Sequence, residues 1–420
     1  MRKNIAFRSF ISFMLLILIV LNLLSCGKEV QPQDLMAEVT RNENTEVTPV
    51  DYENEEFVTD FAVRILKASY KKDENTLISP LSVIYALALT ANGAENNTLA
   101  EMEKTLGIRR DDLNKYLYSY MKNLPQGDDY KLSLANSIWF TDDEKFTVNQ
   151  EFLQTNADYY GGEIYKVPFR PETCDEINEW VKKKTDGMIP EILDEIPEYA
   201  IMYLVNALAF DAKWVEPYEK HQVRSGDFTK EDGTKQKVDF MYCMENLYLE
   251  DDNATGFIKY YKGKKYAFVA LLPNEGVTVS EYIDSLDGKA LHDLLASPQR
   301  AAVETAIPKF ETGFDIELSE VLADMGMPEA FDMKKADFSG MGSYLNRVIY
   351  ISRVLHKTYI SVGEKGTRAG AVTVVEMKND GASIIVDQKV VHLDRPFVYM
   401  LIDCENNQPF FIGTLDNVNN

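Results

Sequence analysis

Cysteine and histidine are the side chains here best suited to chemistry, but their spacing does not favour a catalyst. A hydrolase needs a nucleophile, a base and an orienting acid in contact, yet the chain has no Gly-x-Ser-x-Gly motif, and none of its four histidines lies in a motif that marks a base. Cys174, Cys243 and Cys404 lie far apart and form no Cys-x-x-Cys pair with metal-ligand spacing. We therefore expect buried or half-buried free thiols, no metal, no cofactor and no enzymatic activity.

The fourth cysteine, Cys26, lies in a different setting. A basic head at residues 2–8 and an apolar run at 10–24 precede Leu23-Leu24-Ser25-Cys26-Gly27. This arrangement resembles the lipobox of bacterial lipoproteins, in which a signal peptide is cut before a cysteine that receives lipids. It predicts a signal peptide at 1–25 and a lipid on Cys26, which would hold an exported protein at a membrane, on the periplasmic face or the cell surface. The alternatives are an ordinary signal peptide and a signal anchor.

Charge and composition limit the partners of the remaining chain. The 420 residues contain 44 Lys and Arg against 67 Asp and Glu, a formal net charge of −23. Nucleic-acid binding depends on cationic side chains, so no nucleic-acid partner is expected, and anionic lipid is not expected as the main partner. Residues 26–55 are polar and lack apolar periodicity, which predicts a flexible tether. The folded domain is expected at 56–420.

The elements of this domain are of both kinds, which predicts an α+β fold. Apolar stripes predict one helix around residues 57–66, another that opens at Ser79-Pro80, and a third around 177–181. Continuous apolar runs predict strands, of which the first two are expected to be buried on both faces. These runs are residues 203–210, 266–272, 397–402 and 410–412.

Short motifs then follow one another along the whole domain, from about Glu56 to Val418. They include Leu77-Ile78-Ser79-Pro80-Leu81-Ser82-Val83, Leu134-Ala135-Asn136-Ser137-Ile138-Trp139, Leu204-Val205-Asn206-Ala207, Ala270-Leu271-Leu272-Pro273, Ile307-Pro308-Lys309-Phe310, Val354-Leu355-His356-Lys357, Glu364-Lys365-Gly366-Thr367 and Arg395-Pro396-Phe397. In these motifs and their order, the sequence resembles the serpin family. One such motif would be weak support, whereas this many in one order are specific.

The resemblance implies a serpin fold, with a large central mixed sheet, further sheets, packed helices and an exposed reactive loop at about 364–391. It also implies a suicide-substrate inhibitor, which traps a serine or cysteine protease as an acyl-enzyme by inserting its cleaved loop into the central sheet. The partner would be the target protease, bound covalently by a monomer. The alternative within the family is a non-inhibitory member that acts as a binding protein or chaperone.

The loop can be checked against that mechanism, because an inserting segment must alternate like a strand. The resemblance gives its hinge as Glu364, Gly366, Thr367, Arg368, Ala369, Gly370 and Ala371. From Thr367, every second side chain is uncharged, and the first three are small. This set is Thr367, Ala369, Ala371, Thr373, Val375 and Met377. All charges fall on the intervening positions and no proline interrupts, although an edge strand or a disordered loop would also allow this. Arg368 departs from the family, which usually has Glu there.

Two groups of polar residues are implied to control insertion. Ser79, Ser82, Asn206 and His356 lie in apolar surroundings, and buried polar groups need partners. Without the family resemblance, the simpler interpretation is that these are four unrelated polar residues, each with its own partners. In serpins the matching positions form a hydrogen-bonded cluster under the central strands. A second group lies near the top of the sheet, where the residues that match a family pair are Lys309 and Glu364, with Trp214 close by.

The bond to be cut is assigned by counting along the loop from Gly366 as in the family, which places it at Asp380–Gly381. An Asp before the cut would select proteases with a cationic pocket. The sequence Asn379-Asp380-Gly381 could instead be turn chemistry alone, and the stretch up to Phe397 is longer than usual for the family. The alternative is Lys378–Asn379, which would suit a trypsin-like protease.

Overall fold

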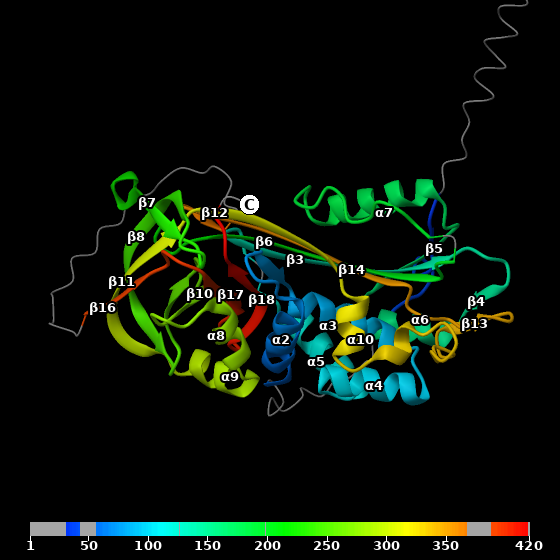
Figure 1. Ribbon diagram of the computed structural model, residues 1–420. Coiled ribbons are helices and arrows are strands. Elements are labelled where there is room, and N and C mark those ends of the chain that lie inside the picture. The colour runs from blue at the N-terminus through cyan, green and yellow to red at the C-terminus, as the bar shows by residue number, and fades with distance from the viewer. Residues whose placement is uncertain (1–30, 43–55, 126, 198, 368–387, 419–420) are drawn as a thin grey trace, which may run out of the picture.

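The computed structural model describes residues 31–42, 56–125, 127–197, 199–367 and 388–418. Within these ranges it contains a large mixed sheet, a second sheet, a small two-stranded sheet and helices packed around them (Figure 1). The predicted α+β class is confirmed, because helices and mixed sheets occur together in these ranges. No helix of the described residues is long and apolar enough to cross a membrane.

The large sheet holds the segments that the sequence singled out. In order across the sheet its strands are β1 (Gln33–Asp34), β5 (Glu163–Val167), β3 (Tyr130–Thr141), β6 (Met202–Lys213), β15 (Gly366–Thr367), β14 (Arg353–Gly363) and β12 (Phe310–Glu317). The central strands β3, β6 and β14 are long, and β6 is buried along almost its whole length. Its continuous apolar run therefore reflects cover on both faces.

The second sheet contains the other predicted strands. In order these are β16 (Gln388–His392), β11 (Gln299–Pro308), β8 (Lys235–Glu250), β9 (Ala254–Tyr260), β10 (Tyr266–Pro273), β17 (Phe397–Asp403), β18 (Gln408–Leu415) and β2 (Thr76–Ile78), with β7 (Val223–Thr229) beside β8. The small sheet pairs β4 (Phe146–Val148) with β13 (Gly342–Tyr344).

Helices cover the two faces of the large sheet unequally (Figure 1). On one face lies α7 (Pro171–Lys184), whose Ile177 and Val181 pack against alternate residues of β6 such as Tyr203 and Val205. Against the other face lies α3 (Pro80–Ala91), which packs on β3 and β6, and α2 (Glu56–Ser69) packs against α3 and against β18 and β2 of the second sheet. The remaining helices are α4 (Asn96–Leu106), α5 (Arg110–Asn123), α6 (Gln150–Tyr159), α8 (Val279–Ser285), α9 (Gly288–Ala296), α10 (Ser319–Asp324) and the short 3₁₀ turns at Lys220–Gln222 and Pro328–Phe331.

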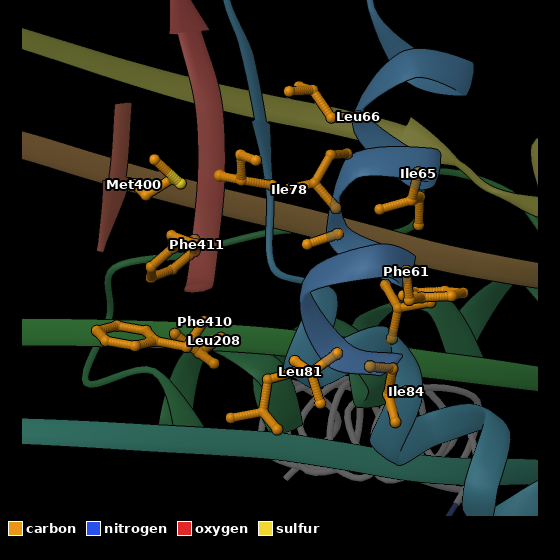
Figure 2. Packing of buried hydrophobic residues seen from close by; sticks show 14 of the residues in the cluster. Phe61, Ile65, Leu66, Ile78, Leu81, Ile84, Leu208, Met400, Phe410 and Phe411 are labelled. Atoms are coloured by element: carbon orange, nitrogen blue, oxygen red, sulfur yellow. The ribbon is translucent and has the colours of Figure 1, made fainter. Parts of the chain in front are cut away.

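The main core lies where α2 and α3 meet the sheets. Figure 2 shows side chains from both helices gathered with others from β2, β6, β17 and β18. The labelled residues are Phe61, Ile65, Leu66, Ile78, Leu81, Ile84, Leu208, Met400, Phe410 and Phe411. Helix α3 is buried on all sides, as its residues allow, since all are apolar apart from Ser82 and Thr90. Packing against β3 and β6 fixes its position beneath these strands.

Part of the predicted tether differs from the expectation. Residues 33–34 form β1, which pairs antiparallel with β5 at the edge of the large sheet. Asn42 donates hydrogen bonds through its backbone and side-chain nitrogens to Asp158 on α6, at 2.9 and 2.8 Å, and the Arg41 guanidinium lies 4.5 Å from the centre of the Tyr118 ring. The expectation of a flexible tether over 26–55 is therefore wrong for residues 31–42. Backbone hydrogen bonds hold β1 at the edge of the sheet, so this strand needs no apolar side chains. Its sequence therefore has no apolar pattern from which a strand could be predicted.

Candidate functional site

β15 separates β6 from β14 at one end of the large sheet. Over about half of their length these two long strands are direct neighbours, and their six parallel residue pairs end at Leu208 and Thr358. Beyond that point Gly366 and Thr367 lie between them, antiparallel to both. The start of the predicted loop therefore already occupies a place in the sheet, and a chain continuing from it would find backbone partners on both edges.

Gly366 and Thr367 are held closely in this place. Gly366 has a φ of 153°, and a Cβ at this position would lie 2.0 Å from the carbonyl oxygen of Ala212 on β6, so only glycine fits. Thr367 is 1% exposed. Its hydroxyl shares a hydrogen bond with the hydroxyl of Tyr261, which lies beneath the sheet. The side chain of Thr367 thus faces inward, as the alternation predicted.

The turn that leads into β15 is fixed by the second predicted group. Lys309 donates a hydrogen bond of 2.8 Å to the Glu364 carboxylate, and this bond holds the pKa of Glu364 below its usual value. The indole nitrogen of Trp214 donates to the carbonyl of Gly363, and its backbone nitrogen to that of Lys365, both at 2.9 Å. Lys309, Glu364 and Trp214 therefore meet at one turn.

The predicted polar cluster lies lower, under the stretch where β6 and β14 are neighbours. Ser79, Ser82, Asn206 and His356 are all fully buried. The His356 ring bridges two of them, because Nε2 accepts from the backbone N–H of Ser79 at 3.1 Å while Nδ1 bonds to Asn206 Oδ1. Since an amide oxygen only accepts, Nδ1 carries the proton. The backbone N–H of Ser82 donates to the Ser79 hydroxyl at 3.3 Å, which caps α3.

This arrangement requires a neutral imidazole. Burial lowers the pKa of His356 from 6.5 to about 3, since a second ring proton would lose solvation and would meet the N–H of Ser79 rather than an acceptor. Within the described ranges, no three His, Cys, Asp or Glu side chains lie close enough together to hold a metal ion. His356 therefore acts as a fixed hydrogen-bonding link between two strands and a helix.

Comparison with known proteins identifies a family to which this sequence and this geometry correspond. A family model described as Serpin (serine protease inhibitor) matches residues 56–418. The chain belongs to the serpin family. It is 47% identical to a thermophilic serpin, tengpin, whose native-state structure it matches with a TM-score of 0.88 over 92% of this chain and 100% of that one.

More distant serpins match over most of their length as well. The chain is 28% identical to leukocyte elastase inhibitor of Equus caballus, over 84% of this chain and 97% of that protein. It is 25% identical to thyroxine-binding globulin in complex with thyroxine, with a TM-score of 0.75 over 87% of this chain and 99% of that one. Serpins are generally protease inhibitors, although some, such as thyroxine-binding globulin, are not.

The remaining predicted residues of this serpin lie outside the described ranges. They are the hinge residues Arg368, Ala369, Gly370 and Ala371, the candidate bonds Asp380–Gly381 and Lys378–Asn379, and the candidate lipid site Cys26. The predicted free thiols are confirmed, since Cys174 is buried and Cys243 and Cys404 are partly exposed, all three unpaired.

Two residues of the site were missed in the sequence. Asn136 on β3 accepts a hydrogen bond of 3.2 Å from Ser82 and lies directly beside Asn206, which itself lies beside His356. The three side chains therefore form one row across β3, β6 and β14. Asn136 stands within one of the quoted motifs, and its polar type in an apolar strand was the available signal. Tyr261, which holds Thr367, gave no signal, because its role depends on how two sheets pack.

Proposed function

We propose that this serpin inhibits a serine or cysteine protease by inserting its cleaved reactive loop into the large sheet. The observation that carries the proposal is the position of β15 between β6 and β14, with Thr367 buried as the first inward side chain. Inhibition would depend on the rate of loop insertion relative to the rate of hydrolysis of the acyl-enzyme. The protease attacks a loop carbonyl and forms an acyl-enzyme, and the loop then inserts before water cleaves that ester.

The register of β15 supports insertion of the rest of the loop. Thr367 pairs with Ala212 on β6 and with Val362 on β14. Six residues further along the loop is Thr373; six residues back along the two strands are Asn206 and His356, which are themselves neighbours. Both ladders therefore bring Thr373, a member of the inward set, into the row of the polar cluster. Its hydroxyl can accept from one neighbour and donate to the other, and so replaces the bond between Asn206 and His356 that insertion breaks.

The same register bears on the cut bond. Continued to Met202, the first residue of β6, the ladder would end at Met377. Both Asp380–Gly381 and Lys378–Asn379 lie beyond this point, so either cut would leave enough chain to fill the sheet. The tethered protease would travel about 34 Å, ten residues of strand. Distortion of its oxyanion hole at the far end would stop hydrolysis. We retain Asp380–Gly381 as the proposed bond.

Anchoring by a lipid on Cys26 belongs to the same proposal. Removal of residues 1–25 and lipidation would place the inhibitor on a membrane, at the periplasmic face or the cell surface, next to proteases met there. The proposal rests on the pattern of residues 1–27.

The test is incubation of the protein, without its signal peptide, with a panel of proteases that cut after acidic, basic or apolar residues. Inhibition predicts a complex that survives denaturant, together with a released C-terminal fragment. A fragment that begins at Gly381 supports the proposed bond, and one that begins at Asn379 makes a basic-specific protease the target. Cleavage by several proteases without any denaturant-resistant complex would refute inhibition and favour a non-inhibitory binding protein. The match to thyroxine-binding globulin in complex with thyroxine supports that alternative.

A further inference from the structure

A partly buried group of reactive side chains lies close to the turn that leads into β15, and nothing in the inhibitory mechanism uses it. The Sγ atom of Cys243 on β8 lies 3.2 Å from Glu245 Oε1 and 3.6 Å from Lys259 Nζ. The hydroxyls of Thr305 and Tyr218 lie 3.2 and 3.3 Å from the same sulfur. A thiol, an amine and a carboxylate thus meet at one point, on neighbouring strands β8 and β9.

Lys259 is buried although it carries a charge, and its surroundings hold it in place. Its side chain is 4% exposed and donates a hydrogen bond of 2.8 Å to Glu245. Its ammonium group lies 4.6 Å from the centre of the Tyr218 ring and 5.4 Å from that of Trp214. An ion pair and two aromatic faces therefore stabilise a buried cation, and they keep its nitrogen beside the sulfur.

We propose that Cys243 and Lys259 form a peroxide-dependent sulfenamide cross-link, a covalent modification site beside the hinge of the reactive loop. Cys243 is a partly exposed residue, which gives a small oxidant a route to its side chain. Burial raises the pKa of the thiol, which makes a spontaneous thiolate scarce. Glu245 supplies the missing base, because its carboxylate is within hydrogen-bonding distance of both the thiol and the ammonium group.

The chemistry balances with hydrogen peroxide as the oxidant. The thiol passes its proton to Glu245, and the sulfur attacks one peroxide oxygen, which gives a sulfenic acid and, with that proton, one water. Lys259 then passes a proton to Glu245, and its amine attacks the sulfur and displaces the hydroxyl as a second water. The S–N bond forms, the sulfur has lost two electrons to the peroxide, and the ammonium proton remains on Glu245.

The cross-link would act on the loop through two neighbours of Lys259. Tyr218 donates its backbone N–H to the carbonyl of Glu364 at 2.9 Å, and Trp214 donates to Gly363 and Lys365 on either side. Cross-linking removes the cation that lies between these two rings. We expect the hydrogen bonds that Tyr218 and Trp214 donate to the turn to weaken. The oxidised protein should then be cleaved without trapping a protease more often than the reduced protein. This second effect rests on the proposed inhibition.

The test treats the protein without its signal peptide with hydrogen peroxide and maps its peptides by mass. The expected product joins the peptide containing Cys243 to that containing Lys259, is lighter than their sum by two hydrogen atoms, and is split by a thiol reductant. Lys259→Arg, which keeps the charge, should abolish it. Cys404, also partly exposed and with a pKa raised by burial to about 12, serves as an internal control that should form no such link.

Recovery of Cys243 as a thiol, or as a sulfinic or sulfonic acid beside an unmodified Lys259, would overturn the proposal. The peptide map needs no target protease, so its failure is distinct from a failure of inhibition. Where a target is found, the ratio of trapped to cleaved protein is compared before oxidation, after oxidation and after reduction. An unchanged ratio in fully cross-linked protein would refute the effect on the loop.

Discussion

His356 shows how much one buried side chain can determine in this molecule. Its two ring nitrogens link β14 to Asn206 on β6 and to the first turn of α3 at Ser79. The ring can do this only when neutral, and burial lowers its pKa to about 3. The place that the proposed insertion would enter is therefore closed by bonds that depend on one protonation state.

The first prediction is that acid weakens the native state through His356. Its pKa is lowered on folding, so its contribution is fully present above about pH 6.5, and is lost as the pH falls towards 3 because only the opened state takes up the proton. The slope is about 1.4 kcal/mol per pH unit. Denaturant midpoints of wild type and His356→Gln between pH 6.5 and 5 test this. Equal slopes for the two proteins would contradict it.

Thr367 allows a sharper test of the inward set. Thr367→Arg should turn the proposed inhibitor into a substrate, because an unpaired charge at a position 1% exposed would cost several kcal/mol and displace β15, from which insertion would continue. Cleavage would continue while the covalent complex disappears on a denaturing gel. The matched control is Arg368→Thr, which changes the outward neighbour and should keep trapping. As much complex from Thr367→Arg as from wild type would mean that the register is wrong.

At the scale of elements, the register of β15 suggests a reason for the departure from the family at Arg368. If the loop inserts and continues this register by one residue beyond Thr367, both ladders would bring Arg368 between Asp211 on β6 and Ser361 on β14, on the outer, half-exposed face. Ser361 donates a hydrogen bond of 3.0 Å to Glu311 on β12. An arginine inserted here would therefore meet carboxylates, and its positive charge suits the row it enters.

Arg368→Glu should accordingly slow insertion, although it restores the residue that the family usually has. Like charges on neighbouring strands cost about 0.5–1 kcal/mol, which predicts an insertion rate about two- to fivefold lower. The measurement is the ratio of cleaved to trapped inhibitor with a protease found in the panel. Arg368→Gln, which removes the charge without reversing it, should lie between the two. A ratio for Arg368→Glu at or below that of wild type would exclude the pairing with Asp211.

At the scale of the whole molecule, the proposed insertion would require two paired strands of the large sheet to separate. β6 and β14 pair directly over six residues as parallel neighbours, and insertion would replace this contact by two antiparallel ladders. Cleavage within the loop should therefore raise the thermal midpoint, since the product gains a strand. A melting curve before and after a clean single cut measures this. No rise would remove the inhibitory interpretation.

The position of the molecule in the cell is also a property of the whole chain. Cys26→Ser should release the protein from the membrane fraction, because a serine at this position cannot carry the acyl chains. Fractionation of the expressing cells tests this, with cleavage at residue 25 followed by mass. Retention of the variant in the membrane with an uncut signal would indicate an anchor helix instead.

The sequence alone determined the family, the α+β class and the main elements, because apolar periodicity and ordered motifs are local properties that survive without coordinates. It also gave the inward alternation from Thr367. The family resemblance implied that Ser79, Ser82, Asn206 and His356 meet, but only the tertiary structure added Asn136 and showed which atoms bond across one helix end and three strands. It alone placed Lys259 beside Cys243, since strand register and sheet packing set that contact. It also revealed β1, whose bonds are made by the backbone and leave no apolar pattern.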